Sequence, residues 1–156
     1  GRTEGAQFEQ PKNIDLVEFI KYKTNDYNML ASKKSITIKF SSNVSSFQII
    51  IQETLFNQIL QNFVQNAIKF TPNGKTIKIK LKKIDDKVIL NVIDEGIGID
   101  ENIDVFAPFK KVGKENGVGL GLYLAKIASD ALNAKISIKN REDGKNGAIA
   151  KLELNL

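Results

Sequence analysis

Apolar residues recur at two spacings along the chain, and each spacing predicts a kind of element. Spacing at every third or fourth residue predicts helices over 14–31, 53–70 and 118–132. Alternation of apolar with polar residues, or a short apolar run, predicts strands over 35–40, 46–51, 76–84, 87–94, 134–140 and 147–156. The sequence Thr71-Pro72-Asn73-Gly74 ends the second helix sharply. The chain therefore mixes helices with strands.

The strand pattern also predicts how the elements are layered. A turn at Asp85-Asp86 and a Gly/Asp/Asn turn before residue 147 indicate hairpins, and a Ser/Asn turn separates strands 35–40 and 46–51. In "TIKIKLKKI" (76–84) lysine alternates with apolar residues, which gives that strand one solvent-exposed face. We therefore predict an α/β fold, a two-layer α/β sandwich. Its mixed, mostly antiparallel sheet carries the helices on one face.

Composition narrows the chemistry available to the chain. Its 156 residues suit one domain, taken as 11–156, with 1–10 as a flexible leader or the edge of an expressed fragment. The chain contains no cysteine and no histidine, which excludes disulfides, imidazole bases and nearly all zinc sites. No apolar run is long enough to span a membrane, and the first residues do not resemble a signal peptide.

The formal net charge of +5 raises the question of nucleic acid as a partner. The lysines, however, are spread along the chain and alternate with isoleucine and leucine rather than with aromatic residues. A surface that binds single strands would interleave aromatic side chains for stacking. The lysines therefore indicate a solvated sheet face, and no nucleic-acid partner is predicted.

Polar residues interrupt the apolar face of the predicted helix 53–70. At about 100° per residue, Asn62, Asn66 and Lys69 fall along one edge of the apolar arc, with Phe70 beside them. Asn66 is a weak helix former at a position where an apolar residue is expected. It is either a satisfied amide at the boundary of the core or an oxygen ligand for a hard cation, with Lys69 directed to a phosphate. The spacing alone leaves both interpretations open.

Two glycine clusters suggest a site for an anion. Asp94 ends a predicted strand and is followed by Gly96 and Gly98, and a second cluster opens the last helix with Gly117, Gly119 and Gly121. Glycines weaken a helix, so their position at an N-terminus favours close approach by a ligand, and the helix dipole favours an anion. A glycine-rich cap on a mobile loop is the other interpretation.

Three standard loops do not fit these clusters. The dinucleotide motif would need a glycine where Leu122 stands, and Gly74–Thr76 lacks the earlier glycine of a P-loop. The calcium loop fails because Gly96 occupies its third position. The sequence therefore indicates an anion site built without any of these loops.

Taken in order, "NFVQNAIKFTPNG" (62–74), "DEGIGI" (94–99), "FAPF" (106–109) and "GVGLGL" (117–122) resemble four motifs of the sensor histidine kinases. These are the N box, the first glycine box, the F box and the second glycine box. Sensor histidine kinases belong to the GHKL group of ATP-binding proteins. The resemblance implies the GHKL ATP-binding fold and the catalytic, ATP-binding domain of a histidine kinase.

The resemblance also implies roles for individual residues. Asn66 would coordinate Mg²⁺, with Asn62 one turn earlier, and Lys69 and Lys111 would meet phosphates as the other catalytic residues. Asp94 would accept a hydrogen bond from the adenine amino group. The remaining residues implied to contact ATP are Phe70, Gly96, Gly98, Phe106, Phe109, Gly117, Gly119, Gly121 and Leu122.

Partners follow from the same resemblance. The domain would bind Mg²⁺ and ATP and pass the γ-phosphate to a histidine on a separate dimerisation domain, for relay to a response regulator receiver domain. The full-length protein would be a cytoplasmic homodimer or the cytoplasmic part of a membrane-bound sensor, with no membrane contact from this domain. The short lid at 110–116 and Val118 leave two alternatives, namely a degenerate module used for protein contacts and an anti-sigma-type serine kinase.

Overall fold

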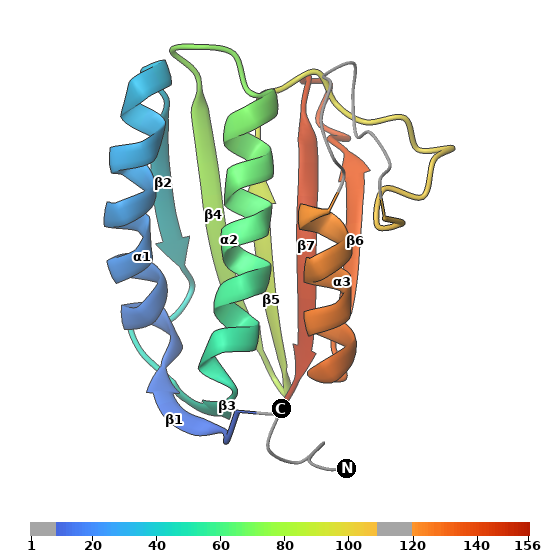
Figure 1. Cartoon of the computed structure of the whole chain (residues 1–156). Helices are drawn as coiled ribbons and strands as arrows, with labels where there is room; N and C mark the ends of the chain where they lie inside the picture. The colour runs from blue at the N-terminus through green and yellow to red at the C-terminus, as the bar shows by residue number, and fades with distance from the viewer. Residues whose placement is uncertain (1–8, 109–119) are drawn as a thin grey trace.

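The structure, a computed structural model, describes residues 9–108 and 120–156. Its helices are α1 (Leu16–Ala31), α2 (Glu53–Phe70) and α3 (Gly121–Ala131), with a short 3₁₀ turn at Ser32–Lys34. Its strands are β1 (Lys12–Asp15), β2 (Thr37–Ser42), β3 (Gln48–Ile51), β4 (Thr76–Ile84), β5 (Lys87–Ile93), β6 (Lys135–Asn140) and β7 (Ala148–Asn155). Figure 1 shows these elements from the side of the helices.

Five of the strands form one sheet in the order β2-β4-β5-β7-β6. Strand β2 runs parallel to β4, and every other neighbouring pair in this sheet is antiparallel. Strands β1 and β3 form a separate antiparallel pair at the lower end of the domain (Figure 1). The predicted mixed, mostly antiparallel sheet is confirmed.

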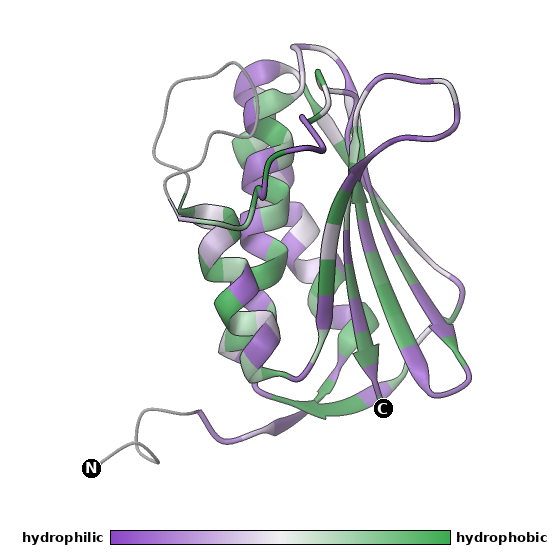
Figure 2. Cartoon of the chain, turned by 90° about the vertical axis from the view of Figure 1, so that its right-hand side faces the viewer, coloured by the Kyte–Doolittle hydropathy of each residue, from purple (hydrophilic) through white to green (hydrophobic). Residues whose placement is uncertain are grey.

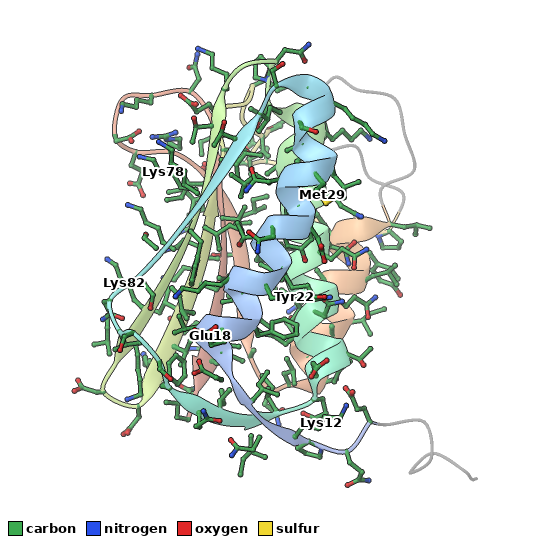
Figure 3. All side chains as sticks on the ribbon, turned by 90° about the vertical axis from the view of Figure 1, so that its left-hand side faces the viewer. Lys12, Glu18, Tyr22, Met29, Lys78 and Lys82 are labelled. Carbon is green, nitrogen blue, oxygen red and sulfur yellow. The ribbon has the colours of Figure 1, made fainter. Side chains whose placement is uncertain are left out.

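The helices form a second layer on one face of the sheet (Figure 2). The core lies between the layers, where α2 contributes Phe56 and Phe63 and β4 contributes Ile77 and Ile79, all at most 1% exposed. The alternate residues of β4 point the other way, and Figure 3 shows Lys78 and Lys82 on the face without helices. The predicted two-layer sandwich is confirmed, because the wet lysine face and the helical layer lie on opposite sides.

The first helix begins two residues later than predicted. The prediction began it at residue 14, whereas residues 12–15 form β1, which pairs with β3. Asp15 caps α1, because its Oδ1 accepts hydrogen bonds from the backbone N–H groups of Val17 (3.0 Å) and Glu18 (3.2 Å). The sequence Asp15-Leu16-Val17-Glu18 carries this signal, since an acid followed three residues later by glutamate is typical of a helix start.

Replacing this cap tests the assignment. We expect Asp15→Ala to lower the free energy of unfolding by about 1 kcal/mol at neutral pH, the usual cost of losing an N-cap. The hydrogen bond from the Ser46 hydroxyl, followed by the backbone bonds, lowers the pKa of Asp15 from 3.8. Because the pKa is lower in the folded state, the contribution is present above pH 3.8 and is lost as the pH falls below it.

Urea unfolding at pH 7 and at acidic pH measures this effect. Asp26→Ala, at an exposed position of the same helix, is the control and is expected not to destabilise the chain. Equal stability of Asp15→Ala and the unmodified chain at pH 7 would contradict the capping role.

The strands predicted at 35–40 and 46–51 lie in different sheets. The Ser/Asn turn between them closes no hairpin, since β2 pairs with β4 and β3 pairs with β1. Ser35 has a left-handed backbone (φ 54°), and β2 begins at Thr37. The chain passes from β2 through β3 and α2 before it reaches β4, and this long connection permits the parallel pairing of β2 with β4.

The remaining boundaries differ from the predictions by a few residues. Strand β5 ends at Ile93, which leaves Asp94 just outside it, and α3 runs over Gly121–Ala131. The predicted start of this helix, residue 118, lies outside the described residues. Within 9–108 and 120–156, each helix is too short or too polar to cross a bilayer.

Candidate functional site

Helix α2 carries the first group of predicted site residues. Asn62, Asn66 and Phe70 are half-buried, and Lys69 is exposed. The Lys69 Nζ lies 5.4 Å from the centre of the Phe70 ring, within the range of a cation–π contact. Neither asparagine side chain hydrogen-bonds to another residue that the structure describes, so both amides are available to a ligand.

Asp94 is held rigidly at the end of β5. It is 6% exposed, and its Oδ1 accepts hydrogen bonds from the backbone N–H groups of Gly96 and Ala148, both at 2.9 Å. Its own N–H donates to the carbonyl of Ala148 (3.0 Å), which extends the pairing of β5 with β7 by one residue. Two adjacent strands therefore fix the position of this carboxylate.

The pKa of Asp94 reflects its burial. Desolvation raises the pKa of this carboxyl, although the two backbone N–H donors and the positive charge of Arg141 act to lower it. Its second oxygen, Oδ2, accepts no hydrogen bond from the residues that the structure describes. Because Oδ1 is already occupied, Oδ2 is the oxygen suited to accept a hydrogen bond from a ligand.

Gly96 and Gly98 bring the chain close to its own neighbours. A Cβ on Gly96 would lie 2.5 Å from the backbone carbonyl oxygen of Phe70. Gly98 has a left-handed backbone (φ 81°), and a Cβ there would lie 2.6 Å from the side chain of Asn140. The segment after Asp94 therefore packs tightly against the end of α2. The predicted contact of these glycines with ATP stays a prediction.

The start of α3 lies beside the polar edge of α2. A Cβ on Gly121 would lie 3.2 Å from the Asn62 Oδ1. Among the residues that the structure describes, no side chain caps the first turn of α3, and unpaired N–H groups at a helix start favour an anion. The side chain of Leu122 is 3% exposed and belongs to the core, so only its backbone can reach a ligand. A groove of about 360 Å³ between α2 and α3 also reaches Asn62.

The structure thus brings together α2, the segment after β5 and the start of α3 from distant parts of the sequence. Phe106 is half-buried and packs on the core, with its N–H donating to Asp104 Oδ1 (3.1 Å). Four predicted site residues lie outside the described residues: Phe109, Lys111, Gly117 and Gly119. Their roles stay predictions.

The described part of the chain offers a metal ion no cage of several acidic side chains. Among the residues that the structure describes, no three His, Cys, Asp or Glu side chains form a metal-binding cluster. Mg²⁺ retains several waters and takes a few oxygen ligands, commonly together with substrate phosphates. The half-buried and unpartnered amide of Asn66 fits this mode of binding, whereas a cage of carboxylates is absent from the described part of the chain.

Sequence reasoning predicted the hairpin of β6 and β7 but missed its contacts with the site. At the turn end of this hairpin, the backbone of Ala148 and the side chain of Arg141 contact Asp94, and the side chain of Asn140 contacts Ile99. The "NREDGKNG" stretch signals only a turn, so nothing local indicates these partners.

Comparison with known proteins places this geometry in a family. Residues 51–156 match the family described as Histidine kinase-, DNA gyrase B-, and HSP90-like ATPase. The sensor protein KdpD of Clostridium acetobutylicum is 34% identical over 152 residues, which cover 92% of this chain and 16% of that protein. The chain therefore spans less than a fifth of this curated relative.

Solved structures show the same fold. The catalytic domain of the histidine kinase ThkA is 28% identical, with a TM-score of 0.83 over 94% of this chain and 95% of that one. ThkA in complex with the response regulator protein TrrA matches with a TM-score of 0.78 at 28% identity, over 93% of this chain and 41% of that one. Full-length ShkA in complex with AMPPNP matches with a TM-score of 0.82 at 25% identity, over 94% and 31%.

The site and the matches agree on one assignment. Asp94, the polar edge of α2 and the start of α3 lie within three of the sequence motifs, 94–99, 62–74 and 117–122. The family match covers all of these elements. The chain therefore belongs to the histidine kinase-, DNA gyrase B- and HSP90-like ATPase family, in the form of the ATP-binding catalytic domain of sensor histidine kinases.

Proposed function

We propose that this chain binds Mg-ATP between α2, the segment after β5 and the start of α3. It then donates the γ-phosphate to a histidine on a separate dimerisation domain of the same full-length protein. A response regulator receiver domain would take the phosphoryl group next. The observation that carries the proposal is the buried Asp94, whose Oδ1 is held by two backbone N–H groups while Oδ2 has no partner among the described residues.

Each predicted residue has a physical role in this proposal. Asp94 accepts a hydrogen bond from the amino group of adenine, and it rejects guanine, whose carbonyl would leave the buried acceptor unpaired. Asn66 supplies an oxygen to Mg²⁺, and Lys69 supplies a positive charge to a phosphate. The start of α3 lies beside Asn62, and the N–H groups of a helix start favour an anion.

The residue at position 62 limits the chemistry. Asn62 lies one turn before Asn66, and an amide there cannot act as a strong base toward water. ATP hydrolysis is therefore expected to be slow, and transfer to an imidazole, which is already nucleophilic, requires no base from this chain. Positioning of the phosphates and stabilisation of their charge then supply most of the catalysis.

The partners are inferred from relatives. ThkA forms a complex with the response regulator protein TrrA, which supports a response regulator as a partner of this chain as well. The dimerisation domain, the homodimer and a cytoplasmic location rest on the resemblance to sensor kinases.

Phosphate transfer tests the proposed function. The chain is incubated with Mg²⁺, γ-labelled ATP and the histidine-bearing helical domain of the full-length protein. We expect label on that domain that is stable in base and lost in acid, as phosphohistidine is. Acid-stable label on a serine would instead indicate a serine kinase. Nucleotide binding without any transfer would indicate a module that serves protein contacts, and either result would contradict the proposal.

A further inference from the structure

The turn between β6 and β7 contacts the Asp94–Ile99 segment at both of its ends. The N–H of Ile99 donates to Asn140 Oδ1 (2.7 Å), and the Asn140 Nδ2 donates to the carbonyl of Ile99 (2.9 Å). At the other end, Arg141 Nη1 donates to the backbone carbonyl of Asp94 (3.0 Å). Figure 3 shows this turn as the pale red loop at the upper left, on the sheet face opposite the helices.

The Arg141 side chain is itself held in place. Its Nε and Nη2 donate to the two carboxylate oxygens of Asp143, at 3.3 and 2.7 Å, and this ion pair lowers the pKa of Asp143 to about 2. The backbone N–H of Arg141 donates to the carbonyl of Gly147 (2.9 Å), which closes the turn. The Arg141 side chain is only 9% exposed, so its guanidinium meets the Asp94 carbonyl in a fixed orientation.

The pairing of Asn140 with Ile99 has two counterparts elsewhere in the fold. Asn28 pairs in the same way with both backbone groups of Ile38 (2.8 and 2.9 Å), and Asn43 pairs with those of Lys83 (2.8 and 3.0 Å). In each case one amide side chain takes the place of a neighbouring strand. Those two pairs lie on β2 and β4, away from Asp94, and their role is to satisfy exposed strand backbone.

The backbone next to Ile99 leaves space for the side chain of Asn140. Gly98, next to Ile99, has a left-handed backbone, and a Cβ there would collide with Asn140 Oδ1. In addition, the backbone N–H of Asn140 donates a hydrogen bond to Glu101 Oε2 (2.8 Å). The segment after Asp94 is therefore fitted to β6 by several contacts at one point.

We propose that Asn140 and Arg141 are positioning residues for nucleotide binding, which hold the Asp94–Ile99 segment in the conformation that presents Asp94 to adenine. The inference rests on the proposed function. Neither side chain touches the nucleotide, and their effect operates through the fraction of molecules in which the segment is ordered. Apparent affinity falls in proportion to that fraction.

Binding of Mg-ADP and Mg-GDP, measured by calorimetry, tests the proposal. We expect Asn140→Ala to weaken ADP binding roughly tenfold, which matches the loss of one or two backbone hydrogen bonds. GDP binding, which does not use Asp94 in the same way, is expected to change less, so the preference for adenine shrinks. Arg141→Met is expected to act in the same direction, and it tests the proposal independently should Asn140→Ala fold poorly.

Asn43→Ala is the matched control. It removes the same kind of amide pair from Lys83, so it is expected to lower the melting temperature while ADP affinity and the adenine preference stay unchanged. Amide hydrogen exchange at Ile99 is expected to speed up in Asn140→Ala and to remain slow in Asn43→Ala.

Two results would distinguish failure of the positioning role from failure of the proposed function. If the unmodified chain binds ADP and both Asn140→Ala and Arg141→Met bind it equally well with unchanged adenine preference, the positioning role is overturned. If the unmodified chain binds no nucleotide, the proposed function fails instead.

Discussion

The Asp94→Asn variant is expected to lose binding of ATP and ADP by roughly 10- to 100-fold while the fold is retained, as expected for a hydrogen bond to a charged group. An asparagine in the same orientation retains Oδ1, which accepts the N–H groups of Gly96 and Ala148. Its Nδ2 replaces the free oxygen, and an amide donor facing the adenine amino group cannot form the hydrogen bond. Calorimetric titration with Mg-ADP measures the loss.

Thermal unfolding of the same variant separates recognition from stability. Burial raises the pKa of Asp94, so its ionisation in the folded state costs stability at every pH above that pKa. A neutral asparagine removes this cost, and the melting temperature is expected to stay the same or to rise. Asp130→Asn, the same chemical change at an exposed position of α3, is expected to leave ADP affinity unchanged. Unaltered ADP affinity in Asp94→Asn would contradict the role of Asp94.

The Asn66→Ala variant is expected to remove the dependence of nucleotide affinity on Mg²⁺ and to reduce phosphate transfer by at least about 100-fold. Mg²⁺ stabilises the negative charge of the transition state of phosphate transfer by several kcal/mol. Asn66 is the residue proposed to hold Mg²⁺. Titrations with ATP in the presence of Mg²⁺ or of EDTA measure the first effect, and transfer of labelled phosphate measures the second.

Gln65→Ala is the control for this variant. It removes an exposed amide from the preceding position of α2 and is expected to leave both measurements unchanged. Alanine is the better helix former, so neither variant is expected to lower the melting temperature. Persistence of Mg²⁺-dependent binding in Asn66→Ala would show that another group holds the metal.

Local patterns in the sequence were enough to predict the elements around the site. The apolar periodicity of residues 53–70 and the Thr-Pro-Asn-Gly sequence after it gave both ends of α2 correctly. The lysine alternation gave β4 and its wet face. These features are local, since a helix or a half-buried strand imposes its own period on the residues within it.

Features that depend on distant pairing were not predictable in the same way. Strand β1 is four residues long and contains one apolar side chain, and it exists because β3 pairs with it. The contact between Asn140 and Ile99 joins residues 41 positions apart. No periodicity encodes such a pair, so the contribution of the β6–β7 turn to the site emerges only from the folded structure.

Calorimetric titration of the unmodified chain with ATP and with GTP, each with and without Mg²⁺, tests the ATP site most directly. We expect saturable ATP binding that strengthens with Mg²⁺ and that exceeds GTP binding by at least about tenfold, because guanine has a carbonyl in place of the amino group that would donate to Asp94. Equal binding of ATP and GTP, or no binding of either, would contradict an adenine site at Asp94.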